Sequence, residues 1–244
     1  MNAHHRELLA TIRERSGKPT QHTFSDSYLG NSHPRYPVDA PTLREIARSW
    51  AKTHRHITAD EFSLLLDSLI KGKSGTEKVM AGILLDGATS AQKKFKPQLF
   101  DRWLDHLEGW AEIDAVCTGK YTVTEIPDNP REWKKLLAGL ARSKNINKRR
   151  ASLVFLTSPI RHSDETWLVE AALQNIDRLK NEKEIIITRA ISWLLRSMCK
   201  LHRSALVAYL QKNETTLPPI AVRETRVKLT TGTKSGGRKR KTDK

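Results

Sequence analysis

The chain has 244 residues and a mass of 27.8 kDa, enough for one large domain or two small ones with a sizeable core. Its 43 Lys and Arg residues outnumber 27 Asp and Glu residues, which gives a net charge of +16. A chain this basic is typical of proteins that bind a polyanion, such as nucleic acid, acidic lipid or an acidic partner protein. No apolar run approaches the ~18 residues of a transmembrane helix, so a membrane span is excluded.

The N-terminal residues lack the long apolar stretch of a secretory signal. The two cysteines, Cys117 and Cys199, are too few for a disulfide scaffold or a four-cysteine zinc site. We therefore expect a reduced cytoplasmic protein.

Apolar residues recur at helical spacing along most of the chain. Leu43, Ile46, Ala47 and Trp50 form the first stripe, behind Pro41 at a first-turn position. The capping-box pairs Thr58 with Glu61 and Ser74 with Glu77 predict the next two helix starts. Later helices are predicted around residues 99–107, 130–140, 151–155, 168–179, 184–202 and 205–210. The β-branched run at 121–126 has no hairpin partner, so we predict an all-α protein without strands.

Helix starts near Trp110, Asn147 and Glu184 recur with a period of about 37 residues, typical of HEAT-like and armadillo-like repeats. We expect a helical-repeat solenoid with a concave basic face over residues 1–229; an irregular all-α bundle is the alternative. Residues 230–244 carry six basic side chains against one acid and no large apolar residue, which predicts a disordered basic tail.

The segment from Arg131 to Arg150 holds eight basic residues and a single acid, a net charge of +7. Guanidinium groups beside a helix N-terminus favour phosphate binding. We therefore predict salt-sensitive contacts to nucleic-acid phosphates, with a solvated surface as the alternative. The residues expected to make such contacts here and on the later helix are Lys144, Lys148, Arg149, Arg189 and Arg196.

An aspartate interrupts an apolar stripe in the segment from Gly109 to Cys117. On a helix, Trp110, Ile113, Asp114 and Cys117 share one face. An unpaired buried carboxylate is costly, so Asp114 must be hydrogen-bonded, ion-paired or placed in a cleft. The structural alternative is a carboxylate that caps a helix or pairs with an arginine such as Arg150, and for Asp114 alone this alternative is favoured.

A second tryptophan, Trp193, lies between the cationic Arg189 and Arg196 on a later helix, away from its apolar stripe. It belongs either to the core or to a concave surface shared with Trp110. Phosphate-binding glycine loops, zincin pairs and hydrolase nucleophile elbows are absent from the sequence. The pair His54 and His56 has no further ligands at metal spacing, so we expect surface histidines and no metal or cofactor.

Five segments together resemble the bacterial alkylpurine DNA glycosylases of the AlkD type, in order from about residue 25 to 229. They are Tyr28-Leu29-Gly30, Pro41-Thr42-Leu43-Arg44, Trp110-Ala111-Glu112-Ile113-Asp114, Lys148-Arg149-Arg150-Ala151 and Arg189-Ala190-Ile191-Ser192-Trp193-Leu194-Leu195-Arg196. The resemblance implies a HEAT-like solenoid that holds duplex DNA on its concave face. It also implies that Asp114 is the catalytic carboxylate and that Trp110, Trp193 and Arg150 bind substrate.

The resemblance therefore predicts a base-excision repair glycosylase that removes cationic N3- or N7-alkylated purines from double-stranded DNA. We expect a monomer in the cytoplasm, associated with the nucleoid. Two alternatives remain: a non-catalytic helical-repeat protein that binds DNA or RNA, and a solenoid that binds an acidic protein.

Overall fold

The computed structural model describes residues 1–16, 18 and 30–235, and the regular elements within these ranges are helices. In chain order they are α1 (Ala3–Ser16), α3 (Ala40–Thr53), α4 (Ala59–Ile70), α5 (Gly75–Gly87), α6 (Leu99–Trp103), the 3-10 helix η1 (Leu104–His106), α7 (Gly109–Cys117), α8 (Lys120–Asp128), α9 (Pro130–Leu140), α10 (Ile146–Thr157), α11 (Pro159–His162), α12 (Thr166–Leu179), α13 (Ile185–Met198), α14 (Arg203–Asn213) and α15 (Pro219–Thr231). Among these described helices, none combines the length and apolar character needed to span a membrane.

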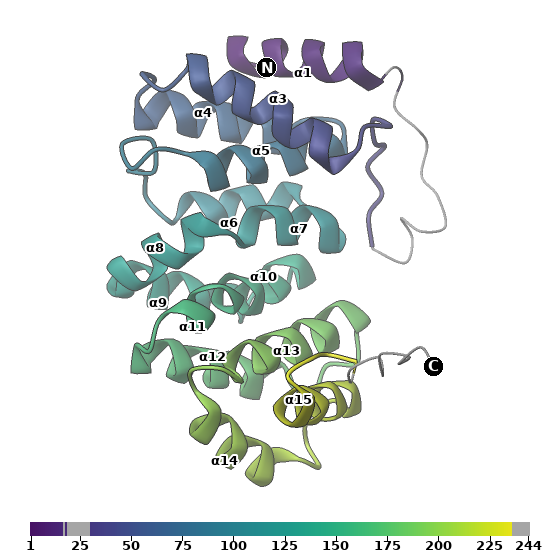
Figure 1. Ribbon diagram of the computed structural model, residues 1–244, viewed down its shortest axis with the longest axis vertical. Coiled ribbons are helices and arrows are strands. Elements are labelled where there is room, and N and C mark those ends of the chain that lie inside the picture. The colour runs from purple at the N-terminus through teal and green to yellow at the C-terminus, as the bar shows by residue number, and fades with distance from the viewer. Residues whose placement is uncertain (17, 19–29, 236–244) are drawn as a thin grey trace, which may run out of the picture.

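The helices stack along the long axis of the molecule in chain order, with α1 at one end and α14 and α15 at the other (Figure 1). One layer consists of helices that each pack against the next, namely α3, α5, α7, α10, α13 and α15. Helices α4, α9, α12 and α14 each pack onto a member of this layer. The starts of α7, α10 and α13 follow the predicted repeat, which confirms the helical-repeat architecture.

Both predicted capping boxes are present. The Thr58 hydroxyl accepts a hydrogen bond from the Glu61 N–H (3.2 Å), and the Glu61 carboxylate accepts one from the Thr58 N–H (2.8 Å). Ser74 and Glu77 repeat this arrangement with the same two distances. Each box satisfies backbone N–H groups that have no partner inside the helix, which fixes where α4 and α5 begin.

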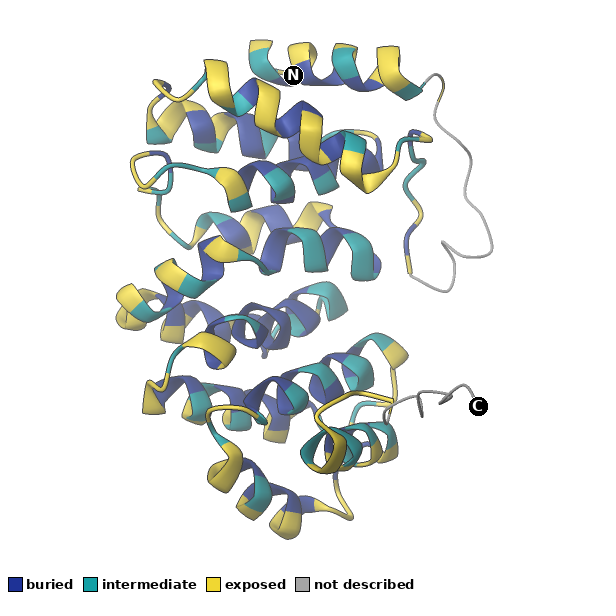
Figure 2. Ribbon diagram, in the orientation of Figure 1, coloured by how far each residue is buried: buried dark blue, intermediate teal, exposed yellow. Residues whose placement is uncertain are grey.

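The buried residues lie between the layers (Figure 2). Aromatic rings fill the centre of the stack: Phe100 packs against Trp133 and Phe155, with ring centroids 5.6 and 5.1 Å apart. Tyr121 joins this cluster from α8, so the β-branched run at 121–126 is helical, as expected of a chain without strands.

Two terminal helices carry weak sequence signals and were not predicted. In α1, the buried His5 donates or accepts hydrogen bonds with Ser68 (2.9 Å) and Glu77 (2.8 Å), which fastens the helix to α4 and α5. Burial favours a higher pKa for Glu77, but hydrogen bonds from His5 and Ser74 outweigh it and lower that pKa. These bonds anchor the first helix of the stack.

At the other end, α15 continues to Thr231 and stops at Gly232, which has a left-handed φ of 76°. The helix thus extends two residues into the segment expected to be a tail. The expected disorder of residues 236–244 lies outside the described residues.

Candidate active site

The start of α7 is fixed by one side chain of α7 itself and one from the start of α10. The Glu108 N–H donates to the Glu112 carboxylate (2.8 Å), and the Gly109 N–H donates to the Asn147 side chain (3.3 Å). Gly109 has a φ of 60°, a left-handed conformation that glycine adopts without strain. The residues after Gly109 therefore enter α7 in one defined orientation.

The helix α7 also lies very close to α5. A Cβ atom added to Gly82 of α5 would collide with the Ala115 carbonyl group of α7. Only glycine permits this approach, which brings the backbone of α7 against α5.

Asp114 and Arg150 form an ion pair between α7 and α10. The Arg150 Nη2 donates to Oδ1 (2.7 Å) and Oδ2 (2.9 Å) of Asp114, and its Nε donates to Oδ1 (3.2 Å). The Arg150 side chain is 3% exposed, whereas the Asp114 side chain is 28% exposed. The guanidinium therefore lies behind the carboxylate, and the carboxylate keeps an accessible edge.

A third helix completes the setting of this pair. The Arg150 Nη1 donates to the Ile186 carbonyl oxygen in the first turn of α13 (2.6 Å). One guanidinium thereby connects α7, α10 and α13, which are neighbours in the same layer. It holds the Asp114 carboxylate in a fixed orientation.

Trp110 lies one helical turn before Asp114, and its indole faces two cations. The Arg189 guanidinium lies 5.0 Å from the ring centroid, and that of Arg150 lies 5.7 Å away. Both distances are within the range of cation–π attraction. Trp193 is half-buried one turn beyond Arg189, on the same face of α13 as Ile186. The structure thus brings Trp110, Asp114, Arg150 and Arg189 together. Trp193 lies outside this group, one turn of α13 beyond Arg189.

The four residues predicted to share one face of α7 differ in how deeply they are buried. Ile113 and Cys117 are buried, while Trp110 and Asp114 are half-buried. Burial raises the pKa of the Asp114 carboxyl above its ordinary 3.8, and Arg150 opposes this rise. Burial raises the pKa of the Cys117 thiol well above its usual range, and the nearby Asp114 charge adds to the effect, so the thiol stays protonated.

Three of the residues expected to contact phosphate form ion pairs within the protein. Lys148 forms ion pairs with Asp101 and Asp105 at 3.0 Å each. Arg149 donates to Glu182 at 2.8 Å, and Arg196 lies 3.4 Å from Glu224. Each of these three side chains is paired with an acid from another segment of the chain, and their contacts with phosphate stay predictions.

Arg150, which is expected to bind substrate, has an almost inaccessible guanidinium that is already bonded to Asp114. A direct contact between Arg150 and substrate stays a prediction. Arg189 faces Trp110, and Lys144 is exposed, so a phosphate contact by either residue stays a prediction.

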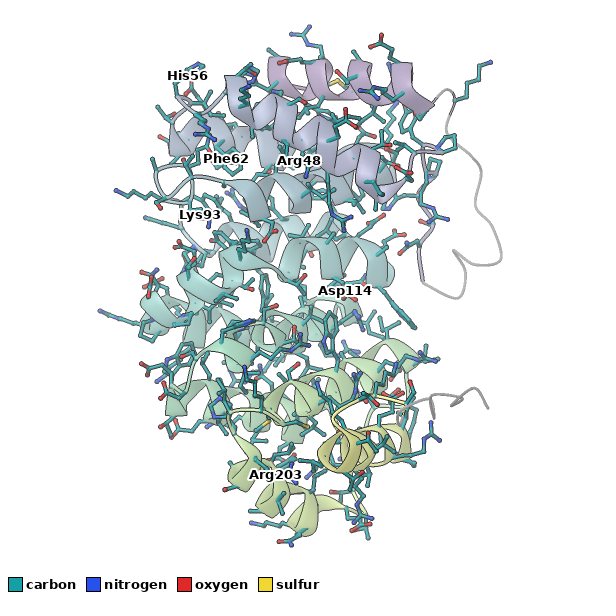
Figure 3. All side chains as sticks on the ribbon, in the orientation of Figure 1. Arg48, His56, Phe62, Lys93, Asp114 and Arg203 are labelled. Atoms are coloured by element: carbon teal, nitrogen blue, oxygen red, sulfur yellow. The ribbon has the colours of Figure 1, made fainter. Side chains whose placement is uncertain are left out.

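A different set of basic residues lines a groove at α3. The groove has a volume of about 800 Å³ and is bounded by α3, α5, α7 and the turns that follow them. Its basic lining residues on and just after α3 are exposed: Arg44, Arg48, Lys52 and Arg55. We call these four residues the α3 ladder. In Figure 3, Arg48 of the ladder and Asp114 on α7 are both labelled, with α5 between their helices.

Sequence reasoning missed the α3 ladder, although a signal was present. Arg44, Arg48, Lys52 and Arg55 are spaced by four, four and three residues, which places them on one face of a helix. Ala115 of α7 and Thr118, the residue that follows this helix, line the same groove, so it reaches the helix that carries Asp114.

Comparison with known proteins identifies the family and a structure of similar fold. A family model described as DNA alkylation repair enzyme matches residues 10–229. A solved structure described as a predicted DNA alkylation repair enzyme from Enterococcus faecalis is similar in fold, with a TM-score of 0.68. The similarity covers 84% of this chain and 93% of that chain at 16% sequence identity. A search among curated proteins finds no match.

Proposed function

Because the chain belongs to the DNA alkylation repair enzyme family, its role is in the repair of alkylated DNA, and we propose that it is a DNA glycosylase. Its substrate is duplex DNA that carries a cationic N3- or N7-alkylated purine, and its reaction is hydrolysis of the N-glycosidic bond. The observation that carries the proposal is the half-buried Asp114 carboxylate, held from behind by Arg150 and one turn from Trp110.

The chemistry requires only one carboxylate. When the C1′–N bond of a cationic alkylpurine breaks, the bonding electrons neutralise the base, so the leaving group needs no general acid. Positive charge develops on the sugar instead, in contrast to glycosidases that use a pair of carboxylates. Water then adds its oxygen to C1′ and gives up one proton.

Asp114 suits this role because Arg150 does not use all of its acceptor capacity. Oδ1 accepts two hydrogen bonds and Oδ2 accepts one, whereas a carboxylate offers about four acceptor positions. The remaining position on Oδ2 can accept a hydrogen bond from the attacking water, and the negative charge stabilises the cationic sugar. This reaction uses water and a carboxylate and requires no cofactor.

Trp110 and Trp193 would present electron-rich rings to the cationic nucleotide and keep bulk water away from the sugar. Recognition by charge makes a deep pocket for a flipped base less necessary than in other glycosylases. Arg189, held over the Trp110 ring, would contact the DNA backbone beside the lesion.

The α3 ladder would hold the DNA backbone through contacts that do not depend on sequence. Its exposed cations and its position two helices from α7 support a path for the duplex along this layer. We propose that the protein acts in this way as a monomer on chromosomal DNA in the cytoplasm.

A non-catalytic DNA-binding protein is the second candidate. The Asp114–Arg150 ion pair itself favours it, since an ion pair between helices can serve stability alone. Both candidates bind DNA, so only the chemistry separates them.

The test is release of free alkylpurines from methylated duplex DNA under single-turnover conditions. We expect the wild-type protein to release bases and Asp114→Asn to be at least 100-fold slower while still binding DNA, because one catalytic carboxylate is worth about 10²–10⁴ in rate. Asp101→Asn, a matched change at an exposed carboxylate outside the site, serves as the control. A wild-type protein that binds DNA without releasing bases would establish the second candidate.

A further inference from the structure

Three metal-ligand side chains meet where α1 crosses the end of α3. His4 and Glu7 lie in the first turns of α1, and His54 is the residue that ends α3. One donor atom from each lies within 4.8 Å of the others. The Glu7 Oε2 is 3.5 Å from the His54 Nε2 and 3.9 Å from the His4 Nδ1.

These separations suit a bridging ion better than direct hydrogen bonds. Hydrogen bonds to nitrogen are about 2.7–3.2 Å long. With zinc–ligand bonds of about 2.0–2.2 Å, neighbouring donors of a tetrahedral site lie roughly 3.4 Å apart. The separations of 3.5 and 3.9 Å are therefore within about half an ångström of that value.

His54 is already oriented as a metal ligand. Its Nδ1 lies 2.9 Å from the Trp50 carbonyl oxygen, and its ring stacks on the Trp50 indole at 4.4 Å. A carbonyl oxygen only accepts hydrogen bonds, so an Nδ1 bonded to Trp50 leaves Nε2, which lies 3.5 Å from the Glu7 carboxylate, as the nitrogen available to a metal. Such a second hydrogen bond is the usual way in which proteins orient a ligating histidine.

The remaining two ligands are held and accessible. The His4 ring makes edge-on contacts with Trp50 (5.5 Å) and His54 (4.9 Å). The side chains of His4 and His54 are half-buried, and that of Glu7 is exposed. An ion can therefore reach the three donors from solvent without opening the core.

We propose that His4, Glu7 and His54 bind one divalent transition-metal ion of the Zn²⁺ class, with water completing the shell. Two imidazole nitrogens and one carboxylate oxygen suit Zn²⁺, whereas Mg²⁺ and Ca²⁺ require more oxygen ligands. The site does not depend on the proposed glycosylase function.

Metal binding would clamp α1 to the helix that carries the α3 ladder. Because His5 already fastens α1 through Ser68 and Glu77, the helix folds without the ion and the ion adds stability. The sequence contains no zinc motif because the ligands come from segments about 50 residues apart, beyond the usual motif spacings.

The test uses the untagged full chain after treatment with a chelator. Calorimetric titration with ZnCl₂ at pH 7.5 should show one equivalent bound and a melting temperature raised by a few degrees, with no response to MgCl₂. His54→Gln and His4→Gln should each weaken Zn²⁺ binding at least tenfold. Glu7→Gln, an exposed position that tolerates change, should do the same. His106→Gln, an exposed histidine elsewhere, should bind as wild type.

A tetrahedral absorption spectrum with Co²⁺, lost in His54→Gln, would add direct support for the ligand set. Absence of binding at 100-fold molar excess of ZnCl₂ would overturn the proposal. Equal binding by the wild type and all three ligand variants would overturn it as well.

Discussion

Two basic parts of the chain are used in opposite ways in the structure. Lys148, Arg149 and Arg150 are consecutive, and each reaches a different neighbour: the acids of α6 and η1, Glu182, and Asp114. The α3 ladder instead projects from one helix face into a groove, exposed along its whole length. The first group holds helices together, and the second is available to a polyanion.

The difference follows from helix geometry. Consecutive residues on a helix point about 100° apart, so a run of three cations spreads over most of its circumference. On a helix packed on several sides, such a run is directed toward neighbouring helices. Cations spaced by three or four residues line one face and add up to a surface field. Local charge density in the sequence is therefore a weaker indicator of a DNA-binding surface than spacing.

The largest expected effect comes from removing the buried member of the first group. Arg150→Ala leaves the Asp114 carboxylate without its guanidinium, which should lower the free energy of unfolding by about 2–3 kcal/mol. Base release should fall about 100-fold because the carboxylate loses its fixed orientation. The slope of log K against log salt for DNA binding should stay unchanged, because the Arg150 guanidinium is almost inaccessible and is already bonded to Asp114.

Single-turnover base release, chemical denaturation and salt-dependent binding measure these three quantities. Arg149→Ala is the matched control, since it removes the neighbouring cation and its pair with Glu182 but touches nothing in the site. If Arg150→Ala does not fold, Arg150→Lys replaces it as the test variant, because lysine keeps the positive charge. A shallower salt slope together with normal base release would show that Arg150 contacts phosphate and would remove the contrast between the two groups.

The next effect concerns the α3 ladder. Changing Arg44, Arg48 and Lys52 to Ser together should flatten the salt slope of DNA binding by about 2.7, which corresponds to three phosphate contacts. Stability should hardly change, because exposed surface charges contribute little to it. Fluorescence anisotropy with a labelled duplex at several salt concentrations measures the slope.

The control for this variant is a second triple change that removes the same amount of positive charge. Arg131, Lys135 and Lys212 are exposed on α9 and α14, away from the layer that contains α3 and α7. Their replacement by Ser should leave the slope nearly as in the wild type. If both triple variants flatten the salt slope of DNA binding equally, binding depends on total charge, and the ladder has no special role.

Features encoded over a few residues could be predicted from the sequence. The two capping boxes, the repeat of α7, α10 and α13, and the placement of Trp110 and Asp114 on one face all follow from local spacing. The alternative in which Asp114 pairs with Arg150 was also recognised, because a buried carboxylate requires a partner.

Contacts between distant segments could not be predicted in the same way. Nothing near Lys148 in sequence indicates that Asp101 and Asp105 neutralise it, and nothing near His54 indicates His4 and Glu7. The helix α15 was missed because it buries few apolar residues and packs through the small Ala221 and Thr225. Such elements depend on the shape of their neighbour, α13, which only the folded chain provides.

The smallest expected effect is a shift in the pH dependence of base release. Burial raises the pKa of Asp114 above 3.8 and Arg150 opposes this rise, and the reaction requires the ionised carboxylate. The rate should therefore fall as the pH decreases through the raised pKa, at a higher pH than for a solvent-exposed aspartate. Arg150→Lys weakens the opposing interaction, because lysine cannot form the forked pair, and should move this acidic limb to still higher pH.

Single-turnover rates from pH 4 to 8, corrected for base loss from DNA without protein, measure the position of this acidic limb. Arg149→Ala should leave the limb in place. A limb that stays fixed in Arg150→Lys would mean that Arg150 stabilises the helices without acting on the carboxylate, so the consecutive cations would serve packing alone.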